Sequence, residues 1–298
     1  MLPQSVLLAA LGAAVISPAM AETDFYGQLN LNSVSLSPDD ARYQAIRDEG
    51  SFFGIRGLRA LQPDLYATYI VEVGAHREDK ADLLGETRQA WAGLRGRLGE
   101  IRIGRQFSPT RVSSERIDLF ANQQGDYNTV LETELTYPAS LTYINHTGTL
   151  DFALALARGD SHDDYADLVA SYSGGDYFVA LGLLKQQHGF SLWRLSAGYQ
   201  PASGHRLGVA MEQKSGSAGY DAILVNAGYR QNRTFYKAQA GHNHAHAGGK
   251  DETMYAIGLD YDLGSNAQLH LEHSRDSHSD HRSGDRQSSY SIGWSYRF

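Results

Sequence analysis

The chain has 298 residues, a formal net charge of −8 and no cysteine, which excludes a disulfide framework and a thiolate metal site. The negative charge, with few basic residues among the aromatic ones, argues against nucleic acid as a partner. The mean hydropathy of −0.41 fits both a soluble protein and a membrane barrel, because the polar lumen face of a barrel offsets its lipid face.

Residues 1–21, MLPQSVLLAALGAAVISPAMA, carry no charge and hold an apolar run over residues 6–16 that precedes the motif AMA. This pattern predicts a secretory signal peptide cleaved after that motif, so that the mature chain begins at Glu22. The segment lacks the usual Lys or Arg after Met1, and a buried helix is the alternative. Its apolar run is too short for a helical membrane span, which needs roughly 20 residues.

The rest of the chain consists of short segments in which apolar and polar residues alternate, as in DFYGQLNLN, LYATYIVEV, DYFVALGLL and the closing SSYSIGWSYRF. Side chains alternate between the two faces of a strand, so each segment predicts a strand with one apolar face. We expect about sixteen antiparallel strands in an all-β chain, which begin near residues 25, 51, 64, 87, 100, 137, 149, 165, 176, 190, 205, 221, 234, 253, 266 and 288.

The connections between these segments alternate between short and long. The short ones include ALQP and GRLG, whereas the longest covers residues 107–136. This alternation is typical of a transmembrane barrel with short periplasmic turns and long external loops. With an even number of strands, the last strand pairs with the first and leaves no open edge. Phe298 is then expected in the aromatic girdle at the periplasmic interface.

The predicted polar face carries many charges, namely Arg56, Glu72, Arg88, Arg194, Arg206, Glu212, Arg230, Lys237, Asp260 and Glu272. We expect this face to be wet, which argues against a soluble β-sandwich, because a sandwich buries the facing sides of its two sheets. No repeat with the period of a propeller blade is visible. A soluble β-protein is therefore the less favoured alternative.

Several stretches resemble the general diffusion porins of Gram-negative outer membranes. They are DFYGQLNLN, SFFGIRG, LYATYIVEV, the terminal YRF and, most specifically, TRQAWAGLRGRLGEIRIGRQ over residues 87–106. The resemblance implies a sixteen-stranded barrel over residues 22–298 in the cell outer membrane, surrounded by lipid and lipopolysaccharide. It also implies a homotrimer and passive diffusion of small hydrophilic solutes and ions. Small residues expected to face outward, Gly27, Ala67 and Gly93, agree with close packing of subunits.

In this family the third external loop folds into the barrel and narrows it, which assigns a constriction loop to residues 107–136. The resemblance implies constriction residues on the loop (Glu115, Asp118 and Asp126) and on the wall (Arg56 and Arg88). The chain departs from the family at Gln28 and Thr136, where many relatives have a basic residue. With two wall arginines against three loop acids, we expect mild cation preference.

Histidines cluster in two predicted external loops, in HNHAH and in HSRDSHSDH. Imidazoles beside carboxylates suit Zn²⁺ or Cu²⁺, which makes His242, His244, His246, His278 and His281 weak candidate ligands, with His273 nearby. Polar loops need no ligand, however, and flexible loops bind metals weakly. The sequence therefore predicts neither a resident metal nor a cofactor.

No catalytic motif accompanies these features. Glycine-rich pieces such as SYSGGDY precede no helix and are expected to be turns rather than phosphate sites, and no Gly-x-Ser-x-Gly elbow is present. We therefore expect a pore that sorts solutes by size and charge, and no enzyme. A solute-specific channel, an outer-membrane barrel enzyme and an adhesive barrel remain alternatives.

Overall fold

The computed structural model describes residues 21–38, 43–75, 84–132, 135–159, 163–216, 218–246, 248–277 and 287–298. The predicted signal peptide falls almost wholly outside these residues, as do His278 and His281. Within the described ranges, no helix has the length and apolar character needed to cross a membrane.

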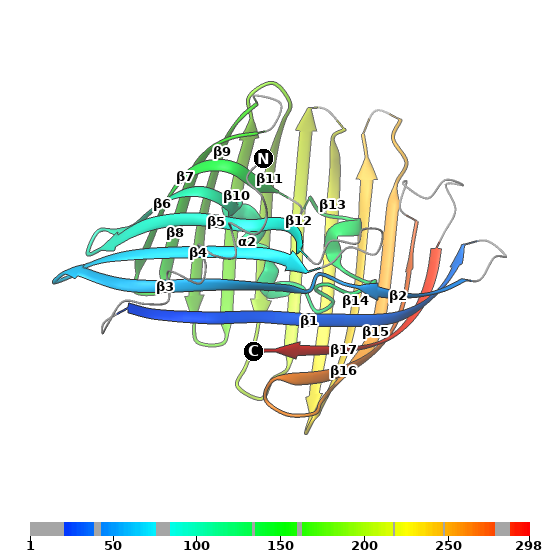
Figure 1. Ribbon diagram of the computed structural model, residues 1–298. Coiled ribbons are helices and arrows are strands. Elements are labelled where there is room, and N and C mark those ends of the chain that lie inside the picture. Colours follow the sequence, from blue (N-terminus) through cyan, green and yellow to red (C-terminus); the bar gives the residue numbers. More distant parts are fainter. Residues whose placement is uncertain are drawn as a thin grey trace.

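The described chain forms a single antiparallel sheet of seventeen strands (Figure 1). They are β1 (Ala21–Pro38), β2 (Tyr43–Asp48), β3 (Phe52–Gln62), β4 (Leu65–Ala75), β5 (Leu84–Gly96), β6 (Gly99–Phe107), β7 (Thr136–Thr147), β8 (Leu150–Arg158), β9 (Asp164–Gly174), β10 (Tyr177–Gln186), β11 (Phe190–Tyr199), β12 (Arg206–Gly216), β13 (Tyr220–Gln231), β14 (Thr234–Ala245), β15 (Glu252–Asp262), β16 (Ala267–Asp276) and β17 (Gln287–Arg297).

The sheet closes on itself. One edge of β1 pairs with β17, and its other edge pairs with β2 over residues 31–36 and with β3 over residues 21–28. Because β2 and β3 pair with successive parts of the same edge of β1, they count as one strand of the barrel. The seventeen strands therefore make a sixteen-stranded barrel. The predictions of an all-β fold, sixteen strands and closure of the last strand on the first are confirmed.

The last residue completes this closure. The backbone N–H of Gly27 donates to the carbonyl of Phe298 at 3.0 Å, and the N–H of Phe298 donates to the carbonyl of Gly27 at 3.1 Å. The Phe298 ring lies over Gly27, where an added Cβ would come within 2.5 Å of it. Phe298 also stacks on Tyr296 and contacts Phe25, so aromatic rings gather at this end of the barrel.

Polarity in this barrel is reversed relative to a soluble protein. Large apolar side chains on the outer face are exposed, among them Leu31, Ile103, Leu156, Leu183 and Ile292, while many of the buried side chains on the inner face are polar. In a closed barrel the backbone N–H and C=O groups of the strands bond to neighbouring strands, so an apolar outer face can contact lipid.

Two features of the connections differ from the sequence-based expectation. At the end of the barrel where long external loops were predicted, the connections 187–189 and 217–219 are as short as turns. At the opposite end, where short turns were predicted, the connection 200–205 is longer than either. Gly216 at the end of β12 and Ala218 before β13 have positive φ angles. The external loop predicted to hold HNHAH was also placed too early, because β14 continues to Ala245 and includes His242 and His244.

The expected row of small outward residues is only partly present. Gly27 is covered by the Phe298 ring. Gly93 pairs with Thr68, whose hydroxyl donates to the buried Glu100 carboxylate at 2.7 Å, so Gly93 faces the lumen. Of the three residues, only Ala67 still agrees with the argument, and it is partly buried, so the sequence argument for subunit packing is correspondingly weaker.

Candidate functional site

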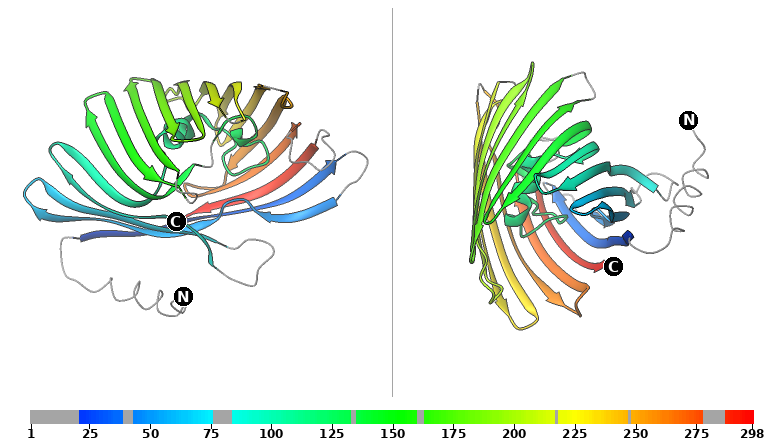
Figure 2. Two further views of the ribbon diagram at one scale, coloured as in Figure 1. Left: turned by 90° about the horizontal axis from the view of Figure 1, so that it is seen from above. Right: turned by 90° about the vertical axis from the view of Figure 1, so that its left-hand side faces the viewer.

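The segment between β6 and β7 carries the helical turns of the described chain: α2 (Pro109–Ser114), η1 (Glu115–Ile117) and η2 (Tyr127–Thr129). The Ser108 hydroxyl caps α2 by accepting from the backbone N–H of Arg111 at 3.0 Å, and Pro109 follows in the first turn. Figure 2 shows this segment in green within the curve of the sheet. We call residues 108–132 the inner loop.

An apolar face of the inner loop packs on an apolar patch of the inner wall. Ile117, Phe120, Tyr127 and Val130 of the loop form one buried cluster with wall residues of β10, β12, β13 and β15, namely Phe178, Ala210, Ala222, Leu224, Met254 and Ala256. Two glycines make room: a Cβ on Gly258 would come within 3.1 Å of the Phe120 ring, and one on Gly241 within 2.7 Å of Val130. The loop is therefore held by packing as well as by hydrogen bonds.

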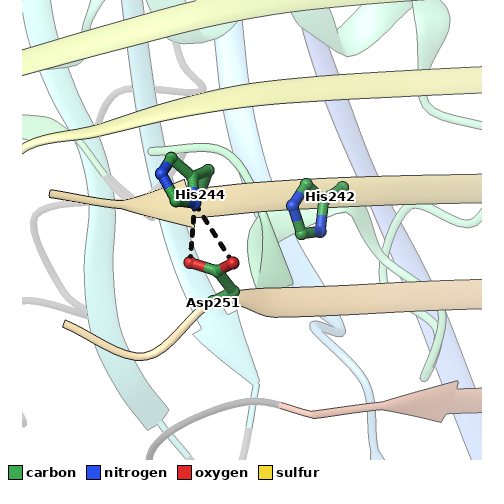
Figure 3. Close-up of side chains that lie close together, drawn as sticks. All are labelled: His242, His244 and Asp251. Carbon is green, nitrogen blue, oxygen red and sulfur yellow. Dashed lines mark hydrogen bonds and ion pairs between the residues drawn. The ribbon is translucent and has the colours of Figure 1, made fainter. Parts of the chain in front are cut away.

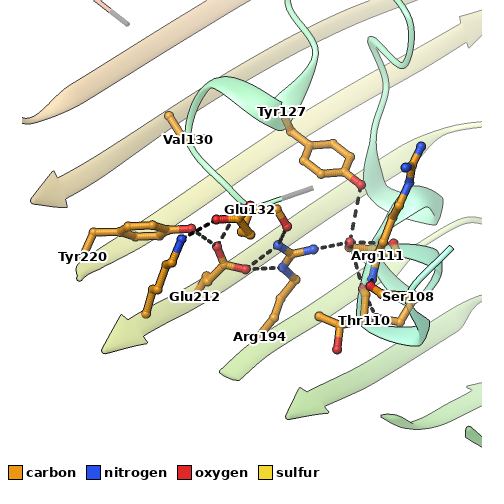
Figure 4. A network of polar contacts seen from close by, with 12 residues as sticks. Ser108, Thr110, Arg111, Tyr127, Val130, Glu132, Arg194, Glu212 and Tyr220 are labelled. Carbon is orange, nitrogen blue, oxygen red and sulfur yellow. Dashed lines mark hydrogen bonds and ion pairs between the residues drawn. The ribbon is translucent and has the colours of Figure 1, made fainter. Parts of the chain in front are cut away.

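Arg194 of β11 is the central polar anchor of the inner loop (Figure 4). Its guanidinium donates to the Glu212 carboxylate at 2.5 Å, to the Ser114 hydroxyl at 2.7 Å and to the carbonyl of Glu132. Glu212 in turn accepts from the Tyr220 hydroxyl at 2.5 Å and from the backbone N–H of Glu132 at 2.8 Å. One buried ion pair thus ties both ends of the loop to the wall.

Further along the wall, side chains of β13 and β14 bind backbone carbonyls of the loop. Asn226 donates to Ile117 at 2.6 Å, Lys237 to Leu119 at 2.9 Å, Gln239 to Gly125 at 3.0 Å and Asn243 to Val130 at 3.0 Å. The prediction that the charged inner face is wet was therefore wrong for the residues that the loop covers, namely Arg194, Glu212, Lys237 and Glu272. It was also wrong for Glu72, which is buried on the wall.

The inner loop reaches the middle of β1, where Asn30 donates to the carbonyl of Asn122 at 2.8 Å, and the wall formed by the start of β1 and by β3–β6 stays open. Its central pair is Arg88, which donates to Glu72 at 2.6 Å and lies 4.6 Å from the Phe52 ring centroid. Arg88 is the extra residue of a β-bulge, since Glu72 pairs with Gln89 and Val73 with Thr87. A bulge redirects a side chain, and here it brings the guanidinium to Glu72.

Other arginines on this wall are also paired and rest on aromatic rings. Arg56 lies 3.3 Å from the Asp24 carboxylate and 4.9 Å from the Tyr26 ring centroid. Arg102 lies 4.1 Å from the Trp91 ring centroid and donates to Glu100 at 2.9 Å, and Arg95 donates to the same carboxylate at 2.8 Å. Sequence reasoning singled out Arg56 and Arg88 only.

The loop contributes its own charges to this opening. Arg111 lies 3.9 Å from the Phe107 ring centroid and 3.4 Å from the Glu115 carboxylate, which is about half exposed. Arg116 donates to the Ser173 hydroxyl at 2.8 Å. Beside them lies a cavity of about 310 Å³, lined in part by Arg102, Arg116 and Gln106. We call the space bounded by this wall and by Arg111 and Glu115 the aperture.

The other two predicted loop acids have partners within the loop itself. The Asp118 carboxylate accepts from the backbone N–H of Phe120 at 2.9 Å. Asp126 caps η2 by accepting from the N–H of Asn128 at 3.0 Å, and it also accepts from Asn122. Burial, and then the nearby Asp126 carboxylate, raise the pKa of Asp118 well above its usual value. The structure thus brings Arg56, Arg88 and Glu115 to the aperture and keeps Asp118 and Asp126 within the loop.

These placements leave positive charge in excess at and beside the aperture. Arg56, Arg88 and Arg111 each have one acidic partner. Arg95 and Arg102 share Glu100, and Arg116 has no carboxylate within ion-pair distance among the described residues. Guanidinium groups held on rings keep their outer N–H donors available. The arrangement can attract anions but holds no triad of nucleophile, base and orienting acid.

A sequence model of a family described as Gram-negative porin matches residues 7–297. No curated protein shows significant similarity to the chain. Among solved structures, the anion-selective porin from Comamonas acidovorans has a TM-score of 0.81 at 18% identity and covers 93% of this chain and 100% of its own. OmpF of Salmonella typhi, in complex with daunomycin, has a TM-score of 0.75 at 16% identity, with coverage of 93% and 97%. A trimer form of OmpT from Vibrio cholerae has a TM-score of 0.72 at 17% identity, with coverage of 94% and 100%.

Proposed function

The chain belongs to the Gram-negative porin family, and we propose that this outer-membrane barrel lets small hydrophilic solutes and ions diffuse passively through the aperture. The observation that carries the proposal is the inner loop, anchored to one side of the lumen and facing an open, arginine-rich wall on the other. Sorting by size and charge at a constriction needs no bond-breaking step.

The expected cation preference rested on three loop acids at the constriction. Asp118 and Asp126 have partners inside the loop. At and beside the aperture the arginines outnumber the carboxylates, because Arg95 and Arg102 share Glu100 and the hydrogen-bond partner of the Arg116 guanidinium among the described residues is a hydroxyl. We therefore propose mild anion preference in place of mild cation preference, despite the net charge of −8. The similarity to a porin named as anion-selective supports this choice. A local charge decides selectivity, because Coulomb interactions strengthen at short range in a partly dehydrated constriction.

We further propose that the barrel works as a homotrimer surrounded by lipid and lipopolysaccharide. A trimer form among the similar structures supports the oligomeric state, and the exposed apolar outer face supports the lipid environment. Chemical cross-linking in mild detergent tests the trimer, and a product no larger than one chain contradicts it.

Single-channel recording in a planar bilayer under a KCl gradient tests the proposed function. We expect ohmic current and a reversal potential shifted toward that of chloride. Absence of current favours an adhesive barrel, and conductance that saturates with one solute favours a solute-specific channel. A reversal potential shifted toward potassium contradicts the proposed anion preference while leaving the channel itself intact.

A further inference from the structure

Three side chains with metal-binding groups converge on the outer face of the barrel, away from the aperture. His242 and His244 project from the same face of β14, and Asp251 lies just before β15 (Figure 3). Their ligand atoms all lie within 4.8 Å of one another, and all three residues are exposed. The His244 Nδ1 atom lies 3.0 Å from one carboxylate oxygen of Asp251 and 3.1 Å from the other.

The two histidines stand on a regular strand rather than on a flexible loop. On one side of β14, His244 pairs with Asp221 and His242 with Ile223. On the other side, His242 pairs with Thr253. Asn243, which lies between the histidines, points inward and donates to the carbonyl of Val130 at 3.0 Å. The objection that flexible loops bind metals weakly therefore does not apply to His242 and His244.

The carboxylate is held as well. One oxygen of Asp251 accepts from the backbone N–H of Ala245 at 3.1 Å, so the end of β14 holds it beside the imidazoles. Metal–ligand bonds of about 2.0–2.2 Å place the ligands of a tetrahedral Zn²⁺ ion roughly 3.5 Å apart. Small rotations of the three side chains are enough to bring ligand atoms now within 4.8 Å of one another to that spacing.

The mixture of ligands selects the class of metal. Imidazole suits Zn²⁺, Cu²⁺ and Ni²⁺, whereas Ca²⁺ and Mg²⁺ prefer sites built from oxygen atoms alone. Two imidazoles and one carboxylate leave a fourth tetrahedral position for water or an outside ligand. We propose that His242, His244 and Asp251 form a Zn²⁺-binding site on the outer rim of the barrel. This site does not depend on the proposed channel function.

Calorimetric titration of the full, folded barrel in detergent with ZnCl₂ tests the site. We expect saturable binding of one ion per chain, with weakening by about tenfold or more in His242→Asn, His244→Asn and Asp251→Asn, because each variant removes one ligand. His146→Asn is the matched control. It breaks another exposed histidine–aspartate ion pair, with Asp151, and is expected to leave Zn²⁺ affinity unchanged.

Each variant must first show the circular dichroism of the folded barrel. Absence of saturable Zn²⁺ binding overturns the proposal. Binding that survives in the His242→Asn/His244→Asn double variant also overturns it, because other groups then hold the metal. Competition by Ca²⁺ at equal concentration contradicts the assigned metal class, and failure of Ca²⁺ to compete supports it.

Discussion

Arg194 of β11 and Glu212 of β12 form an ion pair whose two side chains are completely buried beneath the inner loop. The pair faces the lumen of a barrel, where water would otherwise solvate both charges. Its burial is offset by hydrogen bonds to Ser114, Tyr220 and the backbone of Glu132. A charged pair in this position therefore fastens the loop and is shielded from the lumen.

Arg194→Met should detach the loop. Removing one partner of a buried pair costs about 3–5 kcal/mol because the other charge is left uncompensated, and the loop can relieve that cost by moving away so that water reaches Glu212. We expect larger and noisier single-channel conductance and faster proteolysis of the loop. Arg206→Met, on the next strand, removes an arginine whose one hydrogen bond within the described ranges goes to the carbonyl of His205, and should leave conductance steady. Unchanged conductance in Arg194→Met contradicts the anchoring role.

Glu115→Gln and Asp118→Asn should differ in their effects on selectivity. Glu115 lies at the aperture beside Arg111, so its neutralisation should move the reversal potential further toward anions. Asp118 is held within the loop, and Asp118→Asn should move it much less. An equal shift in both variants, recorded under the same KCl gradient, shows that Asp118 also faces the solute path.

Asp118→Asn should leave the barrel as stable or make it more stable at neutral pH. Because the pKa of Asp118 is raised in the folded chain, the folded state binds more protons than the unfolded state, and stability falls as the pH rises from the ordinary aspartate pKa through the raised one. Asparagine resembles the protonated form and removes that loss. Thermal unfolding at several pH values checks this, and greater destabilisation at pH 7 than at pH 4 contradicts it.

Arg88→Ala should move the reversal potential toward cations, because it leaves the Glu72 carboxylate without its partner at 2.6 Å. The shift should shrink at high salt, since the Debye length falls from about 10 Å at 0.1 M to about 3 Å at 1 M. Arg97→Ala is the matched control: it removes the arginine of an exposed ion pair with Asp64 in a turn. Equal shifts in the two variants, or none in Arg88→Ala, place Arg88 outside the constriction.

Gly27→Val should impair closure of the barrel. A side chain there would come within 2.5 Å of the Phe298 ring and within 2.6 Å of the carbonyl of Phe52, which forces β17 and β3 away from β1. We expect a lower yield of folded barrel in detergent, measured by circular dichroism. Gly264→Ala, where an added Cβ meets no neighbour within 4 Å, should fold normally. Normal folding of Gly27→Val contradicts the role assigned to this contact.

The sequence by itself determined the barrel: its number of strands, the pairing of the last strand with the first, and the apolar outer face. These features follow from the alternation of apolar and polar residues along each strand, which is a local property of the sequence. The tertiary structure alone decided which inner residues face the aperture. Arg194 and Arg88 look alike in the sequence, as inward arginines on alternating strands. The inner loop covers Arg194 through contacts with Ser114 and Glu132, each more than 60 residues away along the chain, whereas a bulge leaves Arg88 at the open wall. No local pattern encodes the face on which a loop docks, because that choice depends on packing between segments far apart in the sequence.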